Sequence, residues 1–283
     1  MTHIADATSA AISRAPRVIA LTSGKGGVGK TNMAVNLSLV YAAQRRRVLL
    51  VDADLGLANV DVLLDRRPRY SIAEVMTGER ELADVLMTTP YGVTVLPGAS
   101  GLQSVADASP SERHRLVSAI EDLGDAFDTI IVDTAAGISS HTLFFAAAAH
   151  DIVVVTTPEP TALTDAYATI KVLSKRYGVQ RVHLLLNQAT DEVSANDLFV
   201  RLSSLTARFL PVVVDYVGRV PSDPRVPEAV HKRRPFIMTA PNSPAASAIR
   251  KIGDALLMRT NAAEASGGVQ LFWNQVIGYA ESS

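Results

Sequence analysis

The motif GKGGVGKT at residues 24–31 constrains the fold of this chain more than any other feature. It matches G-x-x-x-x-G-K-[ST] and stands between an apolar run, RVIALTS (17–23), and a stretch of helical period, TNMAVNLSLVYAAQ (31–44). Glycines let backbone N–H groups turn toward phosphate oxygens, and the amino end of the following helix adds partial positive charge. The residues predicted to bind phosphate are Gly26, Gly27, Val28, Gly29, Lys30 and Thr31, with the Thr31 hydroxyl also a ligand for Mg²⁺.

Short apolar runs alternate with helical segments along the rest of the chain, which predicts βαβ units and an α/β fold. The runs are continuous in hydrophobicity, as is typical of parallel strands covered by helices on both faces. We therefore expect a single P-loop NTPase domain with a mostly parallel, twisted sheet of about seven strands. The expected strands are 17–23, 46–54, 92–97, 128–134, 151–158, 181–188 and 211–218. The later expected helices are 110–123, 139–149, 161–177, 194–210 and 243–258.

Composition removes several classes of protein. The 283 residues include no cysteine, which excludes disulfide scaffolds, thiolate metal sites, iron–sulfur clusters and cysteine nucleophiles. The net charge of −1 gives no bulk attraction to nucleic acid. We expect a mobile amino-terminal arm without secretory features (1–16), an ATPase domain (17–259), a linker (260–268) and an amphipathic carboxyl-terminal helix (269–283), in a cytoplasmic protein.

Three aspartates follow predicted strands that end beside the glycine-rich loop. Asp52 and Asp54 end the run VLLVDAD, and Asp133 ends DTIIVDT. The carboxyl edge of a parallel sheet is where such folds bind ligands, and a Mg²⁺-dependent hydrolase needs carboxylates there to hold the metal and orient water. The alternative for each residue taken alone, Asp52 above all, is a turn or helix-capping aspartate.

The nonapeptide SGKGGVGKT resembles the deviant Walker A motif of the MinD/ParA family of ATPases, and the resemblance covers residues 17–258. It implies a Mg²⁺-dependent ATPase that forms a homodimer around ATP, with Lys25 acting in trans on the partner's nucleotide. By position, Lys30 is catalytic as well as phosphate-binding, Asp54 orients the attacking water, Asp133 holds the metal's water shell and Asp52 lies near the metal. Gly137 falls where the family senses the γ-phosphate; a plain turn glycine is the alternative.

The same resemblance locates the base of the nucleotide. Asn187 closes one predicted strand and the segment from Pro221 to Asp223 follows the next, so both fall at the carboxyl edge of the sheet. In the family these positions frame adenine, and Glu159 contacts the ribose or the other subunit. An ordinary turn Asn and a turn Pro-Ser-Asp remain the alternatives from sequence alone.

Four segments look most like the FlhG (FleN) branch of the family: residues 52–64, 96–103, 133–140 and 154–173. This implies a switch that regulates flagellar number and placement, with flagellar switch or regulatory proteins as partners. Residues 1–16 show no D-Q-A-x-x-L-R-like activator motif, which argues against stimulation of an FlhF-type GTPase. The alternatives are a ParA-like DNA-partitioning or transcription-modulating ATPase and a MinD-like septum-site regulator.

An apolar stripe at helical spacing runs along the carboxyl-terminal segment and consists of Val269, Phe272, Trp273, Val276 and Ile277. It predicts either peripheral contact with the membrane or packing on the domain or a partner. No Lys or Arg follows Arg259, so the basic flank that draws such helices to anionic lipid is missing. The basic clusters 45–47 and 232–234 each follow a helical stretch. The helix dipole favours positive charge at a helix carboxyl end, so a structural role is the preferred interpretation and contact with DNA is the alternative.

Overall fold

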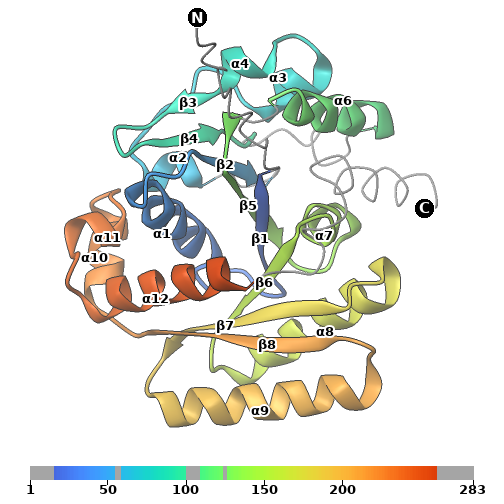
Figure 1. Cartoon of the computed structure of the whole chain (residues 1–283), viewed down its shortest axis with the longest axis vertical. Coiled ribbons are helices and arrows are strands. Elements are labelled where there is room, and N and C mark those ends of the chain that lie inside the picture. Colours follow the sequence, from blue (N-terminus) through green and yellow to red (C-terminus); the bar gives the residue numbers. More distant parts are fainter. Residues whose placement is uncertain (1–15, 55–58, 100–108, 124–125, 260–283) are drawn as a thin grey trace, which may run out of the picture.

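A computed structural model describes residues 16–54, 59–99, 109–123 and 126–259. They form one sheet of eight strands in the order β3-β4-β2-β5-β1-β6-β7-β8, which is parallel except between β3 and β4 (Figure 1). The strands are β1 (Arg17–Ser23), β2 (Val48–Ala53), β3 (Met87–Thr88), β4 (Val93–Leu96), β5 (Thr129–Ala136), β6 (Asp151–Thr156), β7 (Arg181–Ala189) and β8 (Val213–Pro221). The α/β fold and all the expected strands are confirmed. The predicted number is one too low because β3, at two residues, is too short to leave a periodic signal.

Helices cover both faces of the sheet (Figure 1). One face carries α1 (Lys30–Ala43), α2 (Val60–Leu63), α10 (Arg225–His231), α11 (Phe236–Thr239) and α12 (Pro244–Met258). The other carries α3 (Ile72–Thr77), α4 (Leu82–Val85), α6 (Pro110–Glu121), α7 (Ser140–Ala147), α8 (Pro160–Tyr177) and α9 (Glu192–Phe209). Val18 and Ala20 of β1 enter one core, and Ile19 and Leu21 enter the other. This double burial explains the continuous apolar runs.

The long helices begin where the sequence predicts. Ser109 and Ser243 accept backbone N–H groups of α6 and α12, and a proline follows each serine at the first helical position. The short helices α2, α3, α4 and α11 were not predicted, because four to six residues are too few for a helical period to show.

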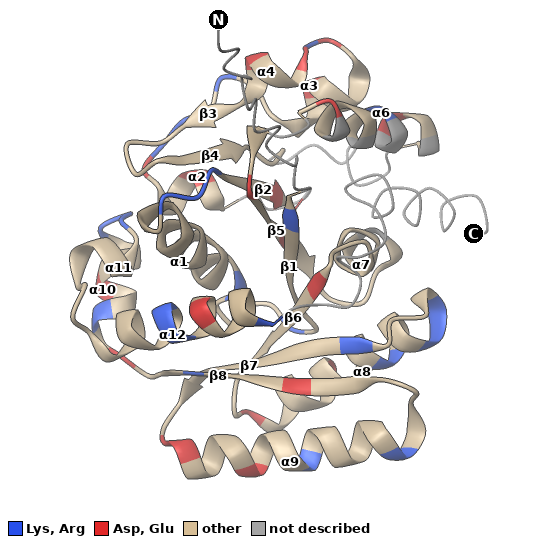
Figure 2. Cartoon of the chain, in the orientation of Figure 1, with Lys and Arg blue, Asp and Glu red and all other residues tan. Residues whose placement is uncertain are grey.

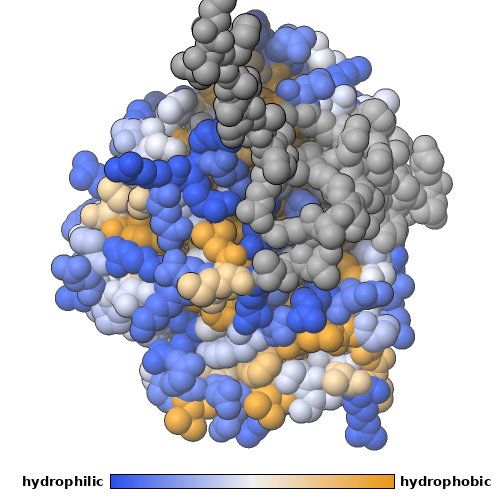
Figure 3. Space-filling model, viewed as in Figure 1, coloured by the Kyte–Doolittle hydropathy of each residue, from blue (hydrophilic) through white to orange (hydrophobic). Residues whose placement is uncertain are grey.

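The surface mixes charges of both signs. Figure 2 shows α9 with an acidic first turn and a basic last turn, which complements the helix dipole. On the face drawn in Figure 3, apolar side chains form small separated groups among hydrophilic ones, an ordinary protein surface. None of the helices in the described ranges has both the length and the hydropathy needed to cross a bilayer. The predicted arm up to residue 15, the linker and the apolar stripe of 269–277 lie outside the described residues.

A buried charged cluster ties together the strand ends opposite the glycine-rich loop. The Arg17 guanidinium donates to the Asp151 carboxylate at 2.7 Å and to the Leu257 and Arg259 carbonyls at the end of α12. His183 Nε2 lies 3.1 Å from the other Asp151 oxygen. Burial raises the pKa of Asp151, but the hydrogen bonds from His183 and Arg17 outweigh it, so the pKa lies below its ordinary value. The cluster therefore joins β1, β6, β7 and α12 through one carboxylate.

We predict that Asp151→Asn lowers the free energy of unfolding at pH 7 by about 3–5 kcal/mol, because Arg17 loses its anion in a buried site. Glu192→Gln is the matched control, since Glu192 pairs with Arg219 but is 65% exposed; we expect a loss below about 1 kcal/mol. Urea unfolding measures both. Because the folded pKa of Asp151 is lowered, its contribution is present above the unfolded pKa of about 3.9 and is lost as the pH falls through the folded value. Equal losses in the two variants would contradict the prediction.

Candidate functional site

The predicted phosphate-binding residues connect β1 to α1 at the carboxyl edge of the sheet. Gly27 and Gly29 have positive φ angles of 80° and 89°, a conformation that glycine adopts without strain. Gly29 is the N-cap of α1 and offers no side chain to its first N–H groups. Those N–H groups and the helix dipole are the elements of an anion site.

Lys30 and Asp133 meet beneath this loop. Lys30 Nζ donates to Asp133 Oδ1 at 2.7 Å, and the two side chains are 7% and 1% exposed. Burial raises the pKa of Asp133, while Lys30 and the Thr31 hydroxyl act in the opposite direction. The contact requires β5 to lie beside β1, since 103 residues separate the two side chains.

A magnesium ion is the metal that the family resemblance implies, and the donors fit it. Asp133 Oδ2 is buried and has no hydrogen-bond partner in the described chain. Thr31 lies beside the same carboxylate. A carboxylate oxygen and a hydroxyl are the hard oxygen ligands that Mg²⁺ takes beside substrate phosphates. Asp133 and Thr31 are therefore the residues of the site that could hold the ion.

Asp52 holds the segment that follows β2. Its side chain is buried, and Asp52 lies opposite Asp133 in the β2–β5 ladder. Oδ1 accepts the N–H of Asp54, and Oδ2 accepts the N–H groups of Asn59 and Val60 at the start of α2, each at 3.2 Å. Burial, followed by the charge of Asp133, raises the pKa of Asp52 to about 7. The oxygens of Asp52, which was predicted to lie near the metal, thus accept hydrogen bonds from the backbone. Asp54 is half-buried and lies near enough to Asp133 for its charge to raise the pKa of Asp133.

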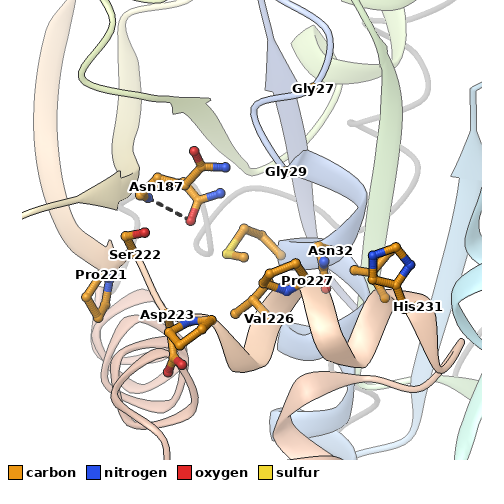
Figure 4. A pocket seen from close by; sticks show the side chains of 14 residues that line it. Gly27, Gly29, Asn32, Asn187, Pro221, Ser222, Asp223, Val226, Pro227 and His231 are labelled. Atoms are coloured by element: carbon orange, nitrogen blue, oxygen red, sulfur yellow. Dashed lines mark hydrogen bonds between the residues drawn. The ribbon is translucent and has the colours of Figure 1, made fainter.

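A cavity of about 550 Å³ opens beside the glycine-rich loop (Figure 4). All three predicted base-pocket residues line it: Asn187, Pro221 and Asp223. Two of them use their polar atoms within the protein. Asn187 Nδ2 donates to the Val28 carbonyl at 2.8 Å, and the Asp223 carboxylate accepts the N–H groups of Arg225 and Ala245.

Sequence reasoning missed one wall of this cavity. α1 and α10 supply it, with the lining residues Asn32, Met33, Val226, Pro227, Val230 and His231, and Gln188 adds a further polar group. A helical stretch was expected before the basic cluster 232–234, and α10 is that helix; its local sequence does not show that it packs beside the glycine-rich loop.

Lys25 and Glu159, assigned separately from sequence, are partners. Lys25 Nζ lies 2.5 Å from Glu159 Oε2 and 3.3 Å from the Thr161 hydroxyl. Both members of the pair are well exposed, at 39% and 60%. Within this single chain, the signature lysine therefore points to the start of α8 on its own subunit.

Gly137 and the arginine cluster also have defined environments. Gly137 has a φ of 102° and donates its N–H to the Ser23 carbonyl at 2.8 Å, so glycine is needed there for the backbone. Arg46 donates to Thr129, and Arg47 pairs with Asp128 at 2.6 Å. These two arginines thus bind the beginning of β5, in agreement with a structural role.

We predict that Lys30→Met lowers the free energy of unfolding of the nucleotide-free protein by about 3–5 kcal/mol, because Asp133 then stays buried without its cation. The double variant Lys30→Met/Asp133→Asn should recover part of that loss. Urea unfolding of the two single variants and the double variant completes a double-mutant cycle. A double variant less stable than Lys30→Met alone would show that the pair does not carry the coupling.

A second prediction concerns pH. With a folded pKa of about 7 for Asp52 against about 3.9 in the unfolded chain, the folded protein binds more protons between these values. Stability should therefore fall as the pH rises from about 4 to about 7. Asp52→Asn removes this titration. The unfolding free energy of wild type minus that of the variant should therefore decrease as the pH rises over that range. A difference independent of pH would contradict it.

Comparison with known proteins agrees with this geometry. A family model described as an AAA domain matches residues 16–184. The antiactivator FleN of Pseudomonas aeruginosa is 43% identical over 261 residues, which cover 92% of this chain and 93% of FleN. The flagellum site-determining protein YlxH of Helicobacter pylori is 31% identical over 267 residues, covering 93% of this chain and 90% of YlxH. The septum site-determining protein MinD of Pyrococcus horikoshii, solved with Mg-ADP, superposes with a TM-score of 0.72 at 27% identity, over 89% of this chain and all of that one. The chain belongs to the MinD/ParA family of P-loop ATPases, in the branch of FleN.

Proposed function

We propose that this protein is a Mg²⁺-dependent ATPase that dimerises around ATP and acts as a switch regulating flagellar number and placement. The observation that carries the proposal is the 43% identity to FleN along nearly the whole of both chains. The similarity to YlxH, named for determining flagellum sites, supports the same assignment.

The chain's own residues account for the proposed hydrolysis. The glycine-rich loop and the first N–H groups of α1 bind phosphate oxygens, and Lys30 exchanges its contact with Asp133 for the β- and γ-phosphates. Thr31 and Asp133 are the residues that would hold Mg²⁺, and the ion would supply positive charge beside those phosphates. Asp54 orients the attacking water. The cavity between α1, β7 and α10 receives the base, with Asn187, Pro221 and Asp223 as its walls.

Lys25 makes the proposed dimer necessary for turnover. In the single chain its ammonium contacts Glu159, and in the dimer it leaves that contact for the nucleotide of the other subunit. Because both side chains are well exposed, screened by water, the exchange breaks no buried ion pair.

The carboxyl-terminal stripe and the partners belong to the same proposal. In this proposal, the apolar stripe of residues 269–277 contacts either the membrane surface or the protein's own domain, and the nucleotide that is bound determines which of the two. Flagellar switch or regulatory proteins are the proposed partners. A DNA-binding function is the weaker alternative, since Arg46 and Arg47 form hydrogen bonds and an ion pair within the fold. A MinD-like role at the septum is the other alternative.

We predict that size-exclusion chromatography shows a dimer with ATP and Mg²⁺ and a monomer with ADP. Asp54→Ala should keep the ATP-dependent dimer and abolish turnover, because water is no longer oriented, whereas Lys30→Ala should lose both. Phosphate release measures turnover. An Asp54→Ala dimer that hydrolyses ATP at the wild-type rate would remove Asp54 from this role.

Affinity capture tests whether the protein acts in flagellar placement: we expect it to capture flagellar switch proteins and not septum proteins.

A further inference from the structure

The basic cluster 232–234, which follows α10, differs from the cluster after α1 in what its side chains contact. After α1, Arg46 and Arg47 bind the beginning of β5. After α10, the side chains of Lys232 and Arg234 are exposed and form no hydrogen bond or ion pair with any described residue (Figure 2). Contacts within the described chain therefore do not account for these two cations.

A second group of exposed cations lies beside this cluster. Asp65 Oδ1, in the loop after α2, lies 3.9 Å from Arg233 Nη1, so the two loops are neighbours although they are far apart in the chain. The side chains of Arg66 and Arg67 form no hydrogen bond or ion pair within the described ranges. We call the exposed Lys and Arg residues of the two loops the basic surface: Arg66, Arg67, Arg69, Lys232, Arg233 and Arg234.

The same backbone motif shapes both loops. Asp65 and Arg233 come just after the ends of α2 and α10, and each has a φ of 50°, in the left-handed region. The N–H of the following residue, Arg66 or Arg234, donates back across the last helical turn at 2.9 and 3.0 Å. This is the Schellman motif, in which glycine is the usual residue. The backbone thus fixes both loops before a partner binds, which lowers the entropy lost on binding.

The helix dipole does not explain this amount of positive charge. α2 spans four residues and α10 spans seven, and the effect of a dipole falls off within the last turn of a helix. Each helix has its acidic residue in its first turn, Asp61 in α2 and Glu228 in α10. Positive charge is therefore concentrated in the two loops of a chain whose net charge is −1, and such a concentration attracts an anionic partner.

The carboxyl-terminal stripe indicates which anionic partner this is. No Lys or Arg follows Arg259, so the stripe of residues 269–277 has no positive charge of its own to draw it to anionic lipid. Stable attachment to a bilayer generally needs two signals, of which an apolar anchor and a basic patch are one combination. The ten residues that lead from Arg259 to the stripe can span about 33–36 Å, so the stripe is not confined to the place where α12 ends.

Apolar side chains close to the two loops in the chain favour lipid over nucleic acid. Val62 of α2 is 47% exposed and Met238 of α11 is 51% exposed. The boundary between headgroups and acyl chains takes up basic and apolar side chains together. Binding to the DNA backbone depends on charge alone, and the net charge of −1 gives it no bulk attraction.

We propose that the basic surface binds anionic lipid headgroups and supplies the positive charge that the carboxyl-terminal segment lacks. Guanidinium groups match phosphate oxygens in bidentate geometry, and five of the six side chains are arginines. The inference rests on the membrane contact within the proposed function. It assigns electrostatic attraction to the folded domain and apolar anchoring to the stripe.

Two double variants test the proposal, each removing two charges from one loop: Arg66→Gln/Arg67→Gln and Lys232→Gln/Arg234→Gln. We expect each to bind vesicles of equal parts phosphatidylglycerol and phosphatidylcholine about 25-fold more weakly than wild type, at about fivefold per side chain. Co-sedimentation of the full chain with ATP and Mg²⁺ measures the binding. Wild type should bind pure phosphatidylcholine weakly, and its binding to the anionic vesicles should fall as salt is added.

Lys175→Gln/Arg201→Gln is the matched control, because it removes two exposed cations from α8 and α9 on the opposite face of the sheet. It should bind the anionic vesicles as wild type does. Equal binding by the loop variants and this control would overturn the proposal. Wild type that binds anionic and pure phosphatidylcholine vesicles equally would also overturn it.

A short DNA duplex is the competing ligand. Wild type that binds the duplex more tightly than the anionic vesicles, with the loss of duplex binding in the same loop variants, would assign the basic surface to nucleic acid and overturn the proposal. Thermal unfolding should be unchanged in all the variants, since the substituted side chains of the loops have no ion pair or hydrogen bond to lose within the described chain.

Chromatography and phosphate release separate this inference from the proposed function. The loop variants should keep the ATP-dependent dimer and the wild-type rate of hydrolysis. Wild type that forms no dimer with ATP would refute the proposed switch, and co-sedimentation of the same protein would still test the basic surface. Wild type that dimerises and hydrolyses ATP but binds no anionic vesicle would refute only this inference.

Discussion

The buried ion pair between Lys30 and Asp133 is the interaction on which the nucleotide site depends. A lysine with 7% exposure is costly to bury alone, and Asp133 offsets that cost across the β1–β5 ladder. Because Lys30 begins α1, the same contact holds the helix whose N–H groups point into the loop. The free Asp133 oxygen beside Thr31 then adds a place for a metal to the same charged centre.

The two ends of the parallel strands have different roles: groups at the amino ends hold the fold together, and groups at the carboxyl ends form the binding site. At the amino edge, Asp151 gathers Arg17 and His183, and Arg17 reaches the carbonyls at the end of α12. Both Asp151 oxygens are engaged by these groups, while His183 Nδ1 is buried with no hydrogen bond in the described chain. At the carboxyl edge, the backbone adopts positive φ angles at Gly27, Gly29 and Gln188. At that edge the glycine-rich loop and the first N–H groups of α1 are open to an anion.

Much of the fold could be predicted from the sequence, because the long strands and helices are buried on regular periods. The continuous run of β1 predicts a strand covered on both faces, and Ser243 with its proline predicts the start of α12. The two-residue β3 could not be predicted, because it is too short for an alternating pattern to show. A helical stretch was expected before the basic cluster 232–234, and α10 is that helix, but no local pattern places it beside the glycine-rich loop. α10 nevertheless forms a wall of the base cavity, so the site was predicted less completely than the fold.

The sequence by itself determined the chemistry of the phosphate site, because the motif from Gly24 to Thr31 is local and its spacing alone sets which groups face an anion. It also determined that aspartates lie in the carboxyl-terminal halves of β2 and β5. Only the tertiary structure decided which residues far apart in the chain form hydrogen bonds: Lys25 with Glu159, and Asn187 with the Val28 carbonyl. The reason is the order of the strands: β6 lies beside β1 and β7 beside β6, and the shifted register of β7 with β8 leaves an exposed Gln188 next to a buried Asn187. Such a register depends on contacts between distant segments, which no local pattern records.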